Sequence, residues 1–588
     1  MDDSIVARLL SLGGKDPGRV AVHILRSAAR GTFRDEQLTM GEWLRGAWTC
    51  AAALQHKRLR RGDRVLLCVP TGHSFLYGFL GASLIGAVPV PLPSLEGFAR
   101  PAAFVKRLVS VVRDAAPSAV FADRRTAAYL RDSGLLDPKM PLIEPRALEP
   151  DGAAPHPDPA SRDEPAVIQY TSGSTGTPRG VVITAANLAA NVDAMAKALD
   201  LGESDRVVSW LPLYHDMGLI GGLLAPIAHG AACWLLSPLE FMLRPASWMQ
   251  AVSEARATLT VAPNFAYGLV ARKVTDDDLK GLDLSTLRAA INGAEPVDPV
   301  IADEFCRRLA PCGFKRTSYF PVYGLAESTL SVAFPPLGRG LKIDNVLRQE
   351  LAEGRAVPAP PGPGTLPLVS VGRAIDGHEI TIVGPDHVQL PERRLGQIWV
   401  RGPSISPWYF EHHQPVPERR TSLRTGDVGY LAEGELYVVD RLKDLVIVAG
   451  RSYSPSDIER VAEAVDGVRS GRSVAFGIPD QELGTESLVV VAEVQPRTPG
   501  ELQDLAERVR TEVAEQIGLV PADVRLLKPG SLSRTSSGKL MRRDARDRYL
   551  SGELAGAEAL RAMLPVRLVG AARKAVLRFV ARRRAAQR

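Results

Sequence analysis

The feature that most constrains the fold is a loop of small, hydroxylated residues that directly follows a buried strand. The stretch YTSGSTGTPRG (residues 170–180) follows the apolar run AVIQ, and the helix-like stretch AANLAANVDAMAKAL comes soon after it. The loop is therefore expected to connect a strand to a helix, and ligands of α/β proteins gather at the carboxyl ends of strands. Closely spaced N–H groups and hydroxyls, with glycines that let a ligand approach, are typical of a phosphate site.

Two other interpretations fit this loop less well. The P-loop pattern requires Gly-x-x-x-x-Gly-Lys-Ser/Thr, but Gly176 is followed by Thr-Pro-Arg-Gly. A flexible Ser/Gly linker with no binding function is the second alternative, and it fits poorly because a buried strand and a helix flank the loop closely. From the loop alone, the phosphate site is favoured over the linker by about two to one.

Strand and helix patterns alternate through the first third of the chain, which indicates a parallel sheet covered on both faces. Strands are expected at residues 64–70 and 118–123, and helices at residues 74–87 and 104–115. The Pro/Gly-rich stretch VPAPPGPGTLP (residues 357–367) is expected to be a surface linker or loop. Beyond it the pattern becomes strand-rich, and a new α+β unit is expected to begin near Asp440.

These patterns predict an α/β protein of more than one domain, as its 588 residues also require. Residues 1–439 are expected to form a large N-terminal domain of parallel-type sheets flanked by helices, with a small β-subdomain. Residues 440–550 are expected to form a small, mobile α+β C-terminal domain, and residues 551–588 a basic tail.

The net charge of +6 is concentrated in that tail. Residues 565–588 hold eight Lys or Arg and no acid, so the rest of the chain carries a net charge of −2. A nucleic-acid-binding body should have a basic face of its own, so no nucleic acid partner is expected. On a helical wheel the tail is a basic amphipathic helix, suited to an anionic membrane surface or an acidic partner. The alternative, a helix packed on its own domain or frayed in solution, has at least equal weight.

Residues 219–236 form an uncharged run of eighteen residues, the short limit for a membrane span. Glycines, a proline and a histidine interrupt it, so a buried helix, a turn and a buried strand are expected instead. The N-terminus lacks the basic region of a signal peptide, and a cytoplasmic protein is expected. No metal site is expected on the cysteines, which should be buried thiols in a reducing compartment: Cys50, Cys68, Cys233, Cys306 and Cys312.

Four further motifs follow the hydroxyl-rich loop in order: VYGLAEST (322–329), LRTGDVGYL (423–431), DRLKDLVIVAGRSYSPSDIE (440–459) and RTSSGKLMR (534–542). Together the five motifs resemble those of the adenylate-forming enzymes, the superfamily of acyl-CoA synthetases, luciferases and peptide-synthetase adenylation domains. The resemblance implies ATP and Mg²⁺ as cofactors. It also implies a rotation of the small domain about a hinge at Lys443.

The resemblance implies a role for each matching residue. Tyr323 would stack on adenine beside Gly324. Glu327 would hold Mg²⁺, and Lys539 would bridge the substrate carboxylate and the α-phosphate. Asp427 would accept both ribose hydroxyls with help from Arg441. Gly293, Ala294 and Glu295 would line the other side of adenine. The residues that would cradle the β,γ-phosphates are Thr171, Ser172, Gly173, Ser174, Thr175 and Gly176, together with Arg179, where the family usually has lysine.

Within the superfamily, SWLPLYHDMGLIGGLLAPIAHG (209–230), APNFAYGL (262–269), INGAEPV (291–297) and RQELAEGRAVPA (348–359) resemble the fatty acyl-AMP ligases. That family forms an acyl-adenylate and passes the acyl group to the phosphopantetheine thiol of an acyl carrier protein, here in trans. An extra segment that hinders the CoA-using conformation is expected between residues 335 and 358. His215 would position the substrate, and the apolar helix after it would either line an acyl tunnel or pack in the core.

Two rival functions remain. The first is an acyl-CoA synthetase, and the second is a catalytically silent homologue that binds a carrier protein as a scaffold. The expected catalytic residues are all present apart from the change to Arg179, which weighs against the scaffold. A monomer is expected.

Overall fold

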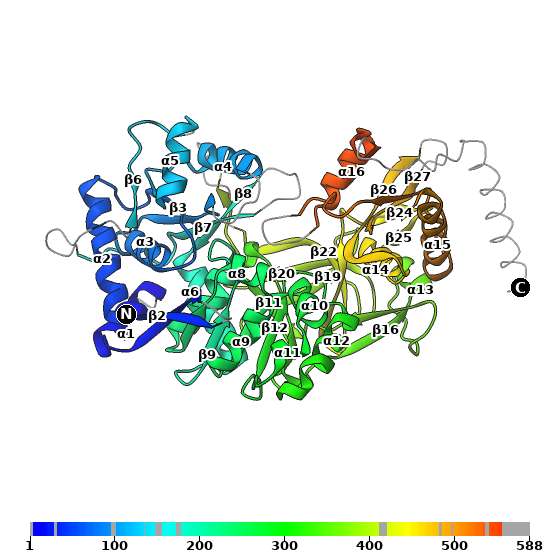
Figure 1. Ribbon diagram of the computed structural model, residues 1–588, viewed down its shortest axis with the longest axis horizontal. Coiled ribbons are helices and arrows are strands. Elements are labelled where there is room, and N and C mark those ends of the chain that lie inside the picture. Colours follow the sequence, from blue (N-terminus) through cyan, green and yellow to red (C-terminus); the bar gives the residue numbers. More distant parts are fainter. Residues whose placement is uncertain are drawn as a thin grey trace, which may run out of the picture. The chain divides into compact units, whose positions relative to one another are not determined.

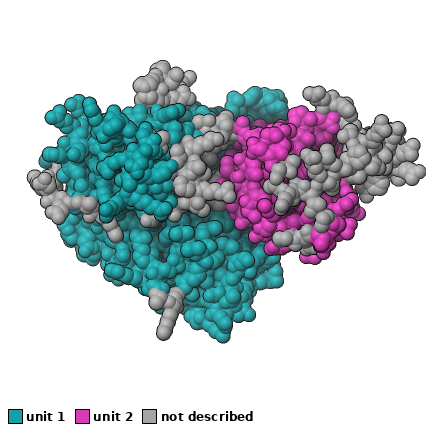
Figure 2. Space-filling model, turned by 45° about the horizontal axis from the view of Figure 1, so that its top comes forward, with its two compact units in different colours: residues 1–344, 367–439 teal, residues 345–366, 440–588 magenta. Residues whose placement is uncertain are grey.

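The computed structural model divides the chain into two compact units. Unit 1 comprises residues 1–344 and 367–439, and unit 2 comprises residues 345–366 and 440–588 (Figure 2). Residues 345–366 therefore group with the C-terminal part of the chain, away from the segments that flank them in sequence. The residues whose structure is described are 4–28, 32–95, 101–134, 136–145, 148, 156–171, 178–410, 420–480, 485–495, 498–534 and 540–555.

The largest sheet of unit 1 has seven strands, and all its neighbouring pairs are parallel except β1 and β2. The strand β11 is buried along its whole length, as expected for a parallel sheet covered by helices. The strands, in spatial order, are β13 (Tyr319–Pro321), β12 (Ala289–Gly293), β11 (Leu259–Pro263), β9 (Arg206–Ser209), β10 (Ala232–Leu235), β1 (Val20–Ser27) and β2 (Phe33–Thr39).

A second sheet of four parallel strands lies in the first third of the chain, where strand–helix alternation predicts it. Its strands, in spatial order, are β4 (Val88–Pro91), β3 (Arg64–Cys68), β5 (Ala119–Ala122) and β6 (Leu142–Ile143). The helices α2 and α3 pack side by side (Figure 1). The fully buried Trp43 of α2 joins them, because its Nε1 donates a hydrogen bond to Leu76 O at 2.9 Å.

The helices of unit 1 supply apolar faces to the buried core around these sheets. The longer ones are α1 (Ile5–Lys15), α2 (Met40–His56), α3 (His73–Leu84), α4 (Pro101–Ala115), α5 (Arg124–Asp132), α6 (Ala185–Leu199), α9 (Ala246–Glu254), α10 (Asn264–Lys273) and α12 (Pro299–Leu309). Parallel sheets covered by helices confirm the α/β class.

The hydroxyl-rich loop connects two strands, so the predicted strand-to-helix connection is wrong. The strand β7 (Pro165–Thr171) pairs antiparallel with β8 (Arg179–Thr184), and α6 begins only after β8. The three buried residues Val181, Val182 and Ile183 are β-branched, which favours a strand there. Thr184 then caps α6, since its hydroxyl accepts from the N–H of Asn187 while the Asn187 side chain accepts from the N–H of Thr184.

The uncharged run of residues 219–236 folds as predicted, into a buried helix, a turn and a strand. A π-helical segment, η4 (Met217–Leu224), continues into α7 (Ala225–Ala228), and Gly230 turns the chain with φ +82° into β10. Among the described helices, none has both the length and the apolar character that a membrane span requires. The five cysteines are buried free thiols, and burial raises the pKa of each.

Antiparallel sheets occupy the strand-rich region beyond residue 322. The largest has the strand order β19 (Glu379–Val383), β20 (Gly396–Arg401), β22 (Ser422–Ala432) and β23 (Glu435–Arg441). A smaller one has the order β14 (Tyr323–Gly324), β15 (Ser331–Phe334) and β18 (Arg373–Ala374). Residues 357–364 form neither helix nor strand and are largely exposed, as the Pro/Gly composition predicts.

Unit 2 is an α+β structure around the three-stranded sheet β26-β27-β28. Its elements are α13 (Arg348–Ala352), β24 (Val446–Val448), β25 (Arg451–Tyr453), α14 (Pro455–Glu463), β26 (Val468–Asp480), β27 (Thr485–Val494), α15 (Pro499–Ile517), β28 (Asp523–Leu527) and α16 (Arg542–Leu550). The short helix α13 is held by a bidentate ion pair, since Arg348 contacts both carboxylate oxygens of Asp457 at 2.7 and 3.1 Å.

The carboxyl group of Glu463, at the end of α14, gives the stability of the chain a specific pH dependence. Its oxygens accept from the N–H groups of Gly471, Arg472 and Ser473. Burial nevertheless dominates and raises the pKa of Glu463 from 4.5 to about 7. Between these values the folded state holds the proton that the unfolded state has released. The contribution of Glu463 to the free energy of unfolding therefore falls as pH rises from 4.5 through 7, by at most about 3 kcal/mol.

We therefore expect Glu463→Gln to flatten the decline in unfolding free energy between pH 5 and pH 8. Chemical denaturation of the full chain across that range measures it. The control is Glu515→Gln, which changes an exposed glutamate of α15 and should leave the decline as in the wild type. An equal decline of unfolding free energy with pH in the wild type and Glu463→Gln would contradict the raised pKa of Glu463.

Candidate functional site

The base of the hydroxyl-rich loop is fixed by two buried side chains of β7. The hydroxyl of Tyr170 donates to Asp114 Oδ2 at 2.5 Å, and Gln169 Nε2 donates to Tyr214 O at 2.6 Å. Thr171 and Arg179 are cross-strand partners where β7 and β8 enter the loop. The predicted phosphate-cradling residues Ser172, Gly173, Ser174, Thr175 and Gly176 lie outside the described residues.

The predicted adenine and ribose residues meet through one hydrogen bond. The hydroxyl of Tyr323 donates to Asp427 Oδ2 at 2.6 Å, although the two residues are 104 positions apart in sequence. Both side chains are largely buried, with 9% and 7% of the residue exposed. A hydrogen bond to a carboxylate is roughly twice as strong as a neutral one, so this contact orients the ring and the acid together.

Two glycines of the predicted site, Gly324 and Gly293, are required by close packing. A Cβ on Gly324 would lie 2.0 Å from Leu330 O, and a Cβ on Gly293 would lie 2.8 Å from a side-chain carbon of Val322. Gly293 therefore lies against the residue that precedes Tyr323. Ala294, which follows, has φ +69°, a strained value for a residue with a side chain. Glu295 is held in place because its Oε2 accepts from the N–H of Phe265 at 3.1 Å.

Glu327, the predicted Mg²⁺ ligand, sits in a short 3₁₀ turn (Ala326–Ser328). Its Oε1 accepts from the hydroxyl of Tyr409 at 2.9 Å, and its backbone oxygen accepts from the N–H of Ser406 at 2.8 Å. Tyr409 lies in β21 (Tyr409–Phe410), which pairs with β8. The guanidinium carbon of Arg179 lies 3.7 Å from the centroid of the Tyr409 ring. Tyr409 thus joins Glu327 to the start of β8.

A buried asparagine holds the turn that carries Glu327. Asn191 of α6 is fully buried. Its amide nitrogen lies 3.3 Å from Ser328 O, 2.9 Å from Ser331 O and 3.0 Å from Ser404 Oγ, while its oxygen accepts from the N–H of Ser331 at 3.0 Å. In the same network Thr329, at φ +67°, donates its hydroxyl to Ser404 O at 2.7 Å. The network fixes the turn against the segment that precedes β21.

His215 lies immediately before η4 with its side chain 29% exposed. Its Nδ1 lies 2.5 Å from Asp216 Oδ1, and the same carboxylate oxygen accepts from the N–H of Met217 at 2.7 Å. The ring is thereby oriented at the start of the π-helical segment, a distortion that is frequent at functional sites. A Cβ on Gly222 would lie 2.8 Å from Ser209 Oγ, so close packing on β9 requires at least this glycine of the segment.

The remaining predicted residues belong to unit 2. Arg441 and Lys443 are exposed. Asp440, which precedes them, is buried and accepts from the Ser454 hydroxyl at 2.7 Å. Arg542 binds both oxygens of Glu459 at 2.8 Å, which anchors the start of α16. Lys539 itself lies outside the described residues.

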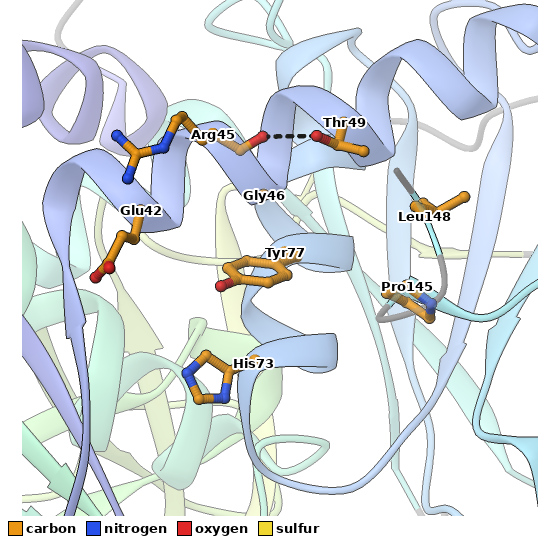
Figure 3. A pocket seen from close by; sticks show the side chains of 8 residues that line it. All are labelled: Glu42, Arg45, Gly46, Thr49, His73, Tyr77, Pro145 and Leu148. Carbon is orange, nitrogen blue, oxygen red and sulfur yellow. Dashed lines mark hydrogen bonds between the residues drawn. The ribbon is translucent and has the colours of Figure 1, made fainter. Parts of the chain in front are cut away.

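A separate groove of about 490 Å³ opens between α2 and α3 in unit 1 (Figure 3). It contains none of the predicted site residues. Its lining residues are Glu42, Arg45, Gly46, Thr49, His73, Tyr77, Pro145 and Leu148. The Glu42 carboxylate already accepts from the Thr39 N–H and hydroxyl, which lowers the pKa of Glu42. We assign the groove no part in the chemistry below.

The arrangement in unit 1 combines an aromatic ring bonded to an acid, a second acid bonded to a phenol, and an arginine at the mouth of a hydroxyl-rich loop. Aromatic, acidic and basic groups of this kind are chemically suited to a base, a ribose and phosphates. Tyr409 and Asn191 were not among the predicted residues, because neither lies in a motif with a chemical pattern of its own. Nothing in the sequence could have shown their contacts.

The comparisons with known proteins identify the family of the chain. A family model described as AMP-binding enzyme matches residues 13–410. The chain belongs to the AMP-binding enzyme family. It is 35% identical over 567 residues to the putative fatty-acid–CoA ligase FadD25 of Mycobacterium tuberculosis, covering 89% of this chain and 94% of that one. It is also 35% identical over 528 residues to the long-chain-fatty-acid–AMP ligase FadD26 of Mycobacterium marinum, covering 83% and 88%.

Solved structures identify the branch of this AMP-binding enzyme. A structure from work on fatty acyl-adenylate ligases of E. coli and L. pneumophila has a TM-score of 0.84 and 31% identity, covering 94% of this chain and 98% of that one. A fatty acyl-adenylate ligase of L. pneumophila in complex with acyl adenylate and pyrophosphate has a TM-score of 0.70 and 28% identity, covering 93% and 96%. This AMP-binding enzyme is therefore an adenylate-forming enzyme of the fatty acyl-AMP ligase branch, and it uses ATP.

The Asn191 network predicts a loss of both stability and activity in one variant. Asn191→Ala removes the acceptor of the Ser331 N–H and the amide donor to Ser331 O, at about 1–3 kcal/mol each, whereas Ser328 O keeps its hydrogen bonds from the Leu330 N–H and the Ser404 hydroxyl. We expect the free energy of unfolding to fall by roughly 3 kcal/mol and pyrophosphate exchange to fall with it, because the turn carries Glu327. Chemical denaturation and an exchange assay measure the two effects.

The matched control is Asn345→Ala, because the Asn345 side chain makes no hydrogen bond to the described residues. It should leave the free energy of unfolding within about 0.5 kcal/mol of the wild type. An Asn191→Ala protein as stable as this control would contradict the role given to the network.

Proposed function

We propose that this enzyme completes two half-reactions. In the first, which is that of its branch, a fatty acid is activated by ATP: a carboxylate oxygen attacks the α-phosphorus, the bond to the β-phosphate breaks, and acyl-AMP and pyrophosphate form. In the second, the phosphopantetheine thiol of an acyl carrier protein, supplied in trans, attacks the acyl carbonyl and AMP leaves. The observation that carries the proposal is the hydrogen bond from Tyr323 to Asp427, which joins the two nucleotide motifs in one site.

In this proposal the residues of unit 1 bind and orient ATP. Tyr323 stacks on adenine with Gly324 beside it, and Gly293, Ala294 and Glu295 line the other side. Asp427 accepts the ribose hydroxyls with the help of Arg441. Thr171, Arg179 and residues 172–176 hold the β,γ-phosphates. His215 positions the acyl carboxylate, since attack by a carboxylate requires no base.

Glu327 fits a magnesium ion. Among the described residues only its Oε1 has a hydrogen-bond partner, so Oε2 remains available as the oxygen ligand that Mg²⁺ prefers. The ion would neutralise phosphate charge. Tyr409 orients the Glu327 carboxylate, and burial together with that carboxylate raises the pKa of Tyr409, so the phenol keeps its proton.

Lys539 places its positive charge between the acyl carboxylate and the α-phosphate. The small domain rotates about Lys443 between the two half-reactions. The segment 345–366 supports transfer of the acyl group to a carrier protein rather than to CoA. That segment overlaps the region where the resemblance places an insertion that hinders CoA use. It groups with unit 2 through the Arg348–Asp457 pair and through Glu353, whose carboxylate binds Arg451 at 2.5 Å.

One experiment separates the carrier from CoA. The purified enzyme receives ATP, Mg²⁺ and a panel of fatty acids, with either CoA or a holo acyl carrier protein, and mass spectrometry follows acyl-AMP and thioester. We expect acyl-AMP in every case and thioester only with the holo carrier. Prompt thioester formation with CoA alone would favour the acyl-CoA synthetase, and the absence of acyl-AMP would favour a silent scaffold.

The role of Lys539 gives a second prediction. Loss of one preorganised donor to a developing charge costs about 10²–10³ in rate. We expect Lys539→Ala to lose pyrophosphate exchange by at least that factor while its dissociation constant for ATP changes little. Lys528→Ala, which removes an exposed lysine from the same unit, is the control and should keep full exchange. Near-normal exchange in Lys539→Ala would refute the assignment.

A further inference from the structure

Tyr409 lies between two arginines. The guanidinium carbon of Arg179 is 3.7 Å from the ring centroid, and that of Arg420 is 4.3 Å from it. Two guanidinium groups cannot share one ring face at these distances, so they occupy opposite faces. The ring separates two positive charges that would otherwise repel each other, and the negative potential of each face attracts one of them.

The backbone produces this stack from two distant segments. β21 pairs antiparallel with β8, so that Tyr409 lies opposite Val181 and Phe410 opposite Gly180. This register brings Arg179, at the start of β8, beside the ring. Arg420 lies beside the same ring, and its backbone N–H donates to Pro407 O at 3.1 Å. The stack is thus a consequence of the strand pairing at the mouth of the hydroxyl-rich loop.

The stack formed by Arg179, Tyr409 and Arg420 has an excess of positive charge. Within the described part of the chain, neither Arg179 nor Arg420 makes a side-chain hydrogen bond or an ion pair. The acid that contacts the stack is Glu327, bound to the Tyr409 hydroxyl. Each guanidinium offers planar N–H donors, and the ring face engages none of these directly. Two such groups held apart at a fixed spacing suit an anion with several oxygens, because arginine binds phosphate oxygens in pairs.

We propose that Arg420 is a second phosphate-binding arginine of this site, held opposite Arg179 by Tyr409, and that the two bind the oxygens of the pyrophosphate part of ATP. The inference rests on the proposed nucleotide site and deepens it. It also explains how arginine serves at residue 179, where lysine is usual. The flat guanidinium stacks on Tyr409, and Arg420 supplies the second charge.

The test uses inorganic pyrophosphate as the probe, with the full chain and no acyl substrate, in titration calorimetry. We expect Arg420→Gln to weaken pyrophosphate binding by roughly 10- to 100-fold, the effect of losing a charged hydrogen-bond donor. Binding of AMP, which lacks that part of ATP, should remain within twofold of the wild type. Arg420→Lys should recover only part of the affinity, because it restores the charge without the planar donors.

Three further variants complete the design. Tyr409→Phe keeps the ring and should bind pyrophosphate within a few-fold of the wild type, whereas Tyr409→Leu removes the ring and should bind as weakly as Arg420→Gln. Arg401→Gln removes an exposed positive charge from β20 of the same unit and is the control for net charge, with binding expected within twofold. Thermal unfolding checks that every variant is folded, and Arg420→Lys provides the comparison if Arg420→Gln is not.

Unchanged pyrophosphate affinity in Arg420→Gln, or an equal loss in Arg401→Gln, would overturn the inference. An equal loss of AMP and pyrophosphate binding would overturn it too, because the residue would then act on the fold of the site. These outcomes are distinct from failure of the proposed function. An enzyme that forms no acyl-AMP would refute that function, while the pyrophosphate titration would still decide the role of Arg420.

Discussion

The site in unit 1 depends on the hydrogen bonds of one buried amide, that of Asn191. An amide in the core costs free energy unless its donors and acceptor are bonded, and here Ser328, Ser331 and Ser404 bond all of it. The amide therefore fixes the turn of Glu327 and the segment before β21 in one arrangement. The two segments are also bonded directly, from the Ser406 N–H to Glu327 O and from the Thr329 hydroxyl to Ser404 O, and together these contacts bring Tyr409 to Glu327.

Two further contacts join the predicted site residues of unit 1. The β7–β8 hairpin carries the hydroxyl-rich loop, and β21 extends the same sheet so that Tyr409 lies beside Arg179. The strand β14 carries Tyr323, whose hydroxyl bonds Asp427 of β22. The residues predicted to bind adenine, ribose and phosphate therefore come from different sheets of unit 1. Unit 2 carries the exposed Arg441 and Lys443. It also carries α16, which begins at the last residue of the motif RTSSGKLMR and is anchored by the bond from Arg542 to Glu459.

Much of the fold followed from the sequence. Alternation of apolar strands and amphipathic helices predicted the parallel sheets, and the interrupted run at residues 219–236 predicted a buried helix, a turn and a strand. The hairpin at the hydroxyl-rich loop was missed, because residues 181–184, between the loop and the helix, were assigned to no element although three of them are β-branched and apolar. The sequence motifs contain several of the residues that the structure brings together, among them Tyr323 and Asp427. They did not name Tyr409, Asn191 or Arg420, whose contacts join segments far apart in sequence.

The sequence by itself determined the chemistry that is available: hydroxyls and glycines at a strand end, an aromatic residue, two acids that the resemblance assigns to ribose and metal, and a lysine near the C-terminus, in an order that resembles the adenylate-forming enzymes. Periodicity and composition are local, so they can reveal such pieces without showing which of them touch. The tertiary structure alone decided that Tyr323 bonds Asp427, that Tyr409 separates two arginines, and that residues 345–366 group with the C-terminal unit. The physical reason is that strand register and buried hydrogen bonds join distant segments, and no local pattern records those partners.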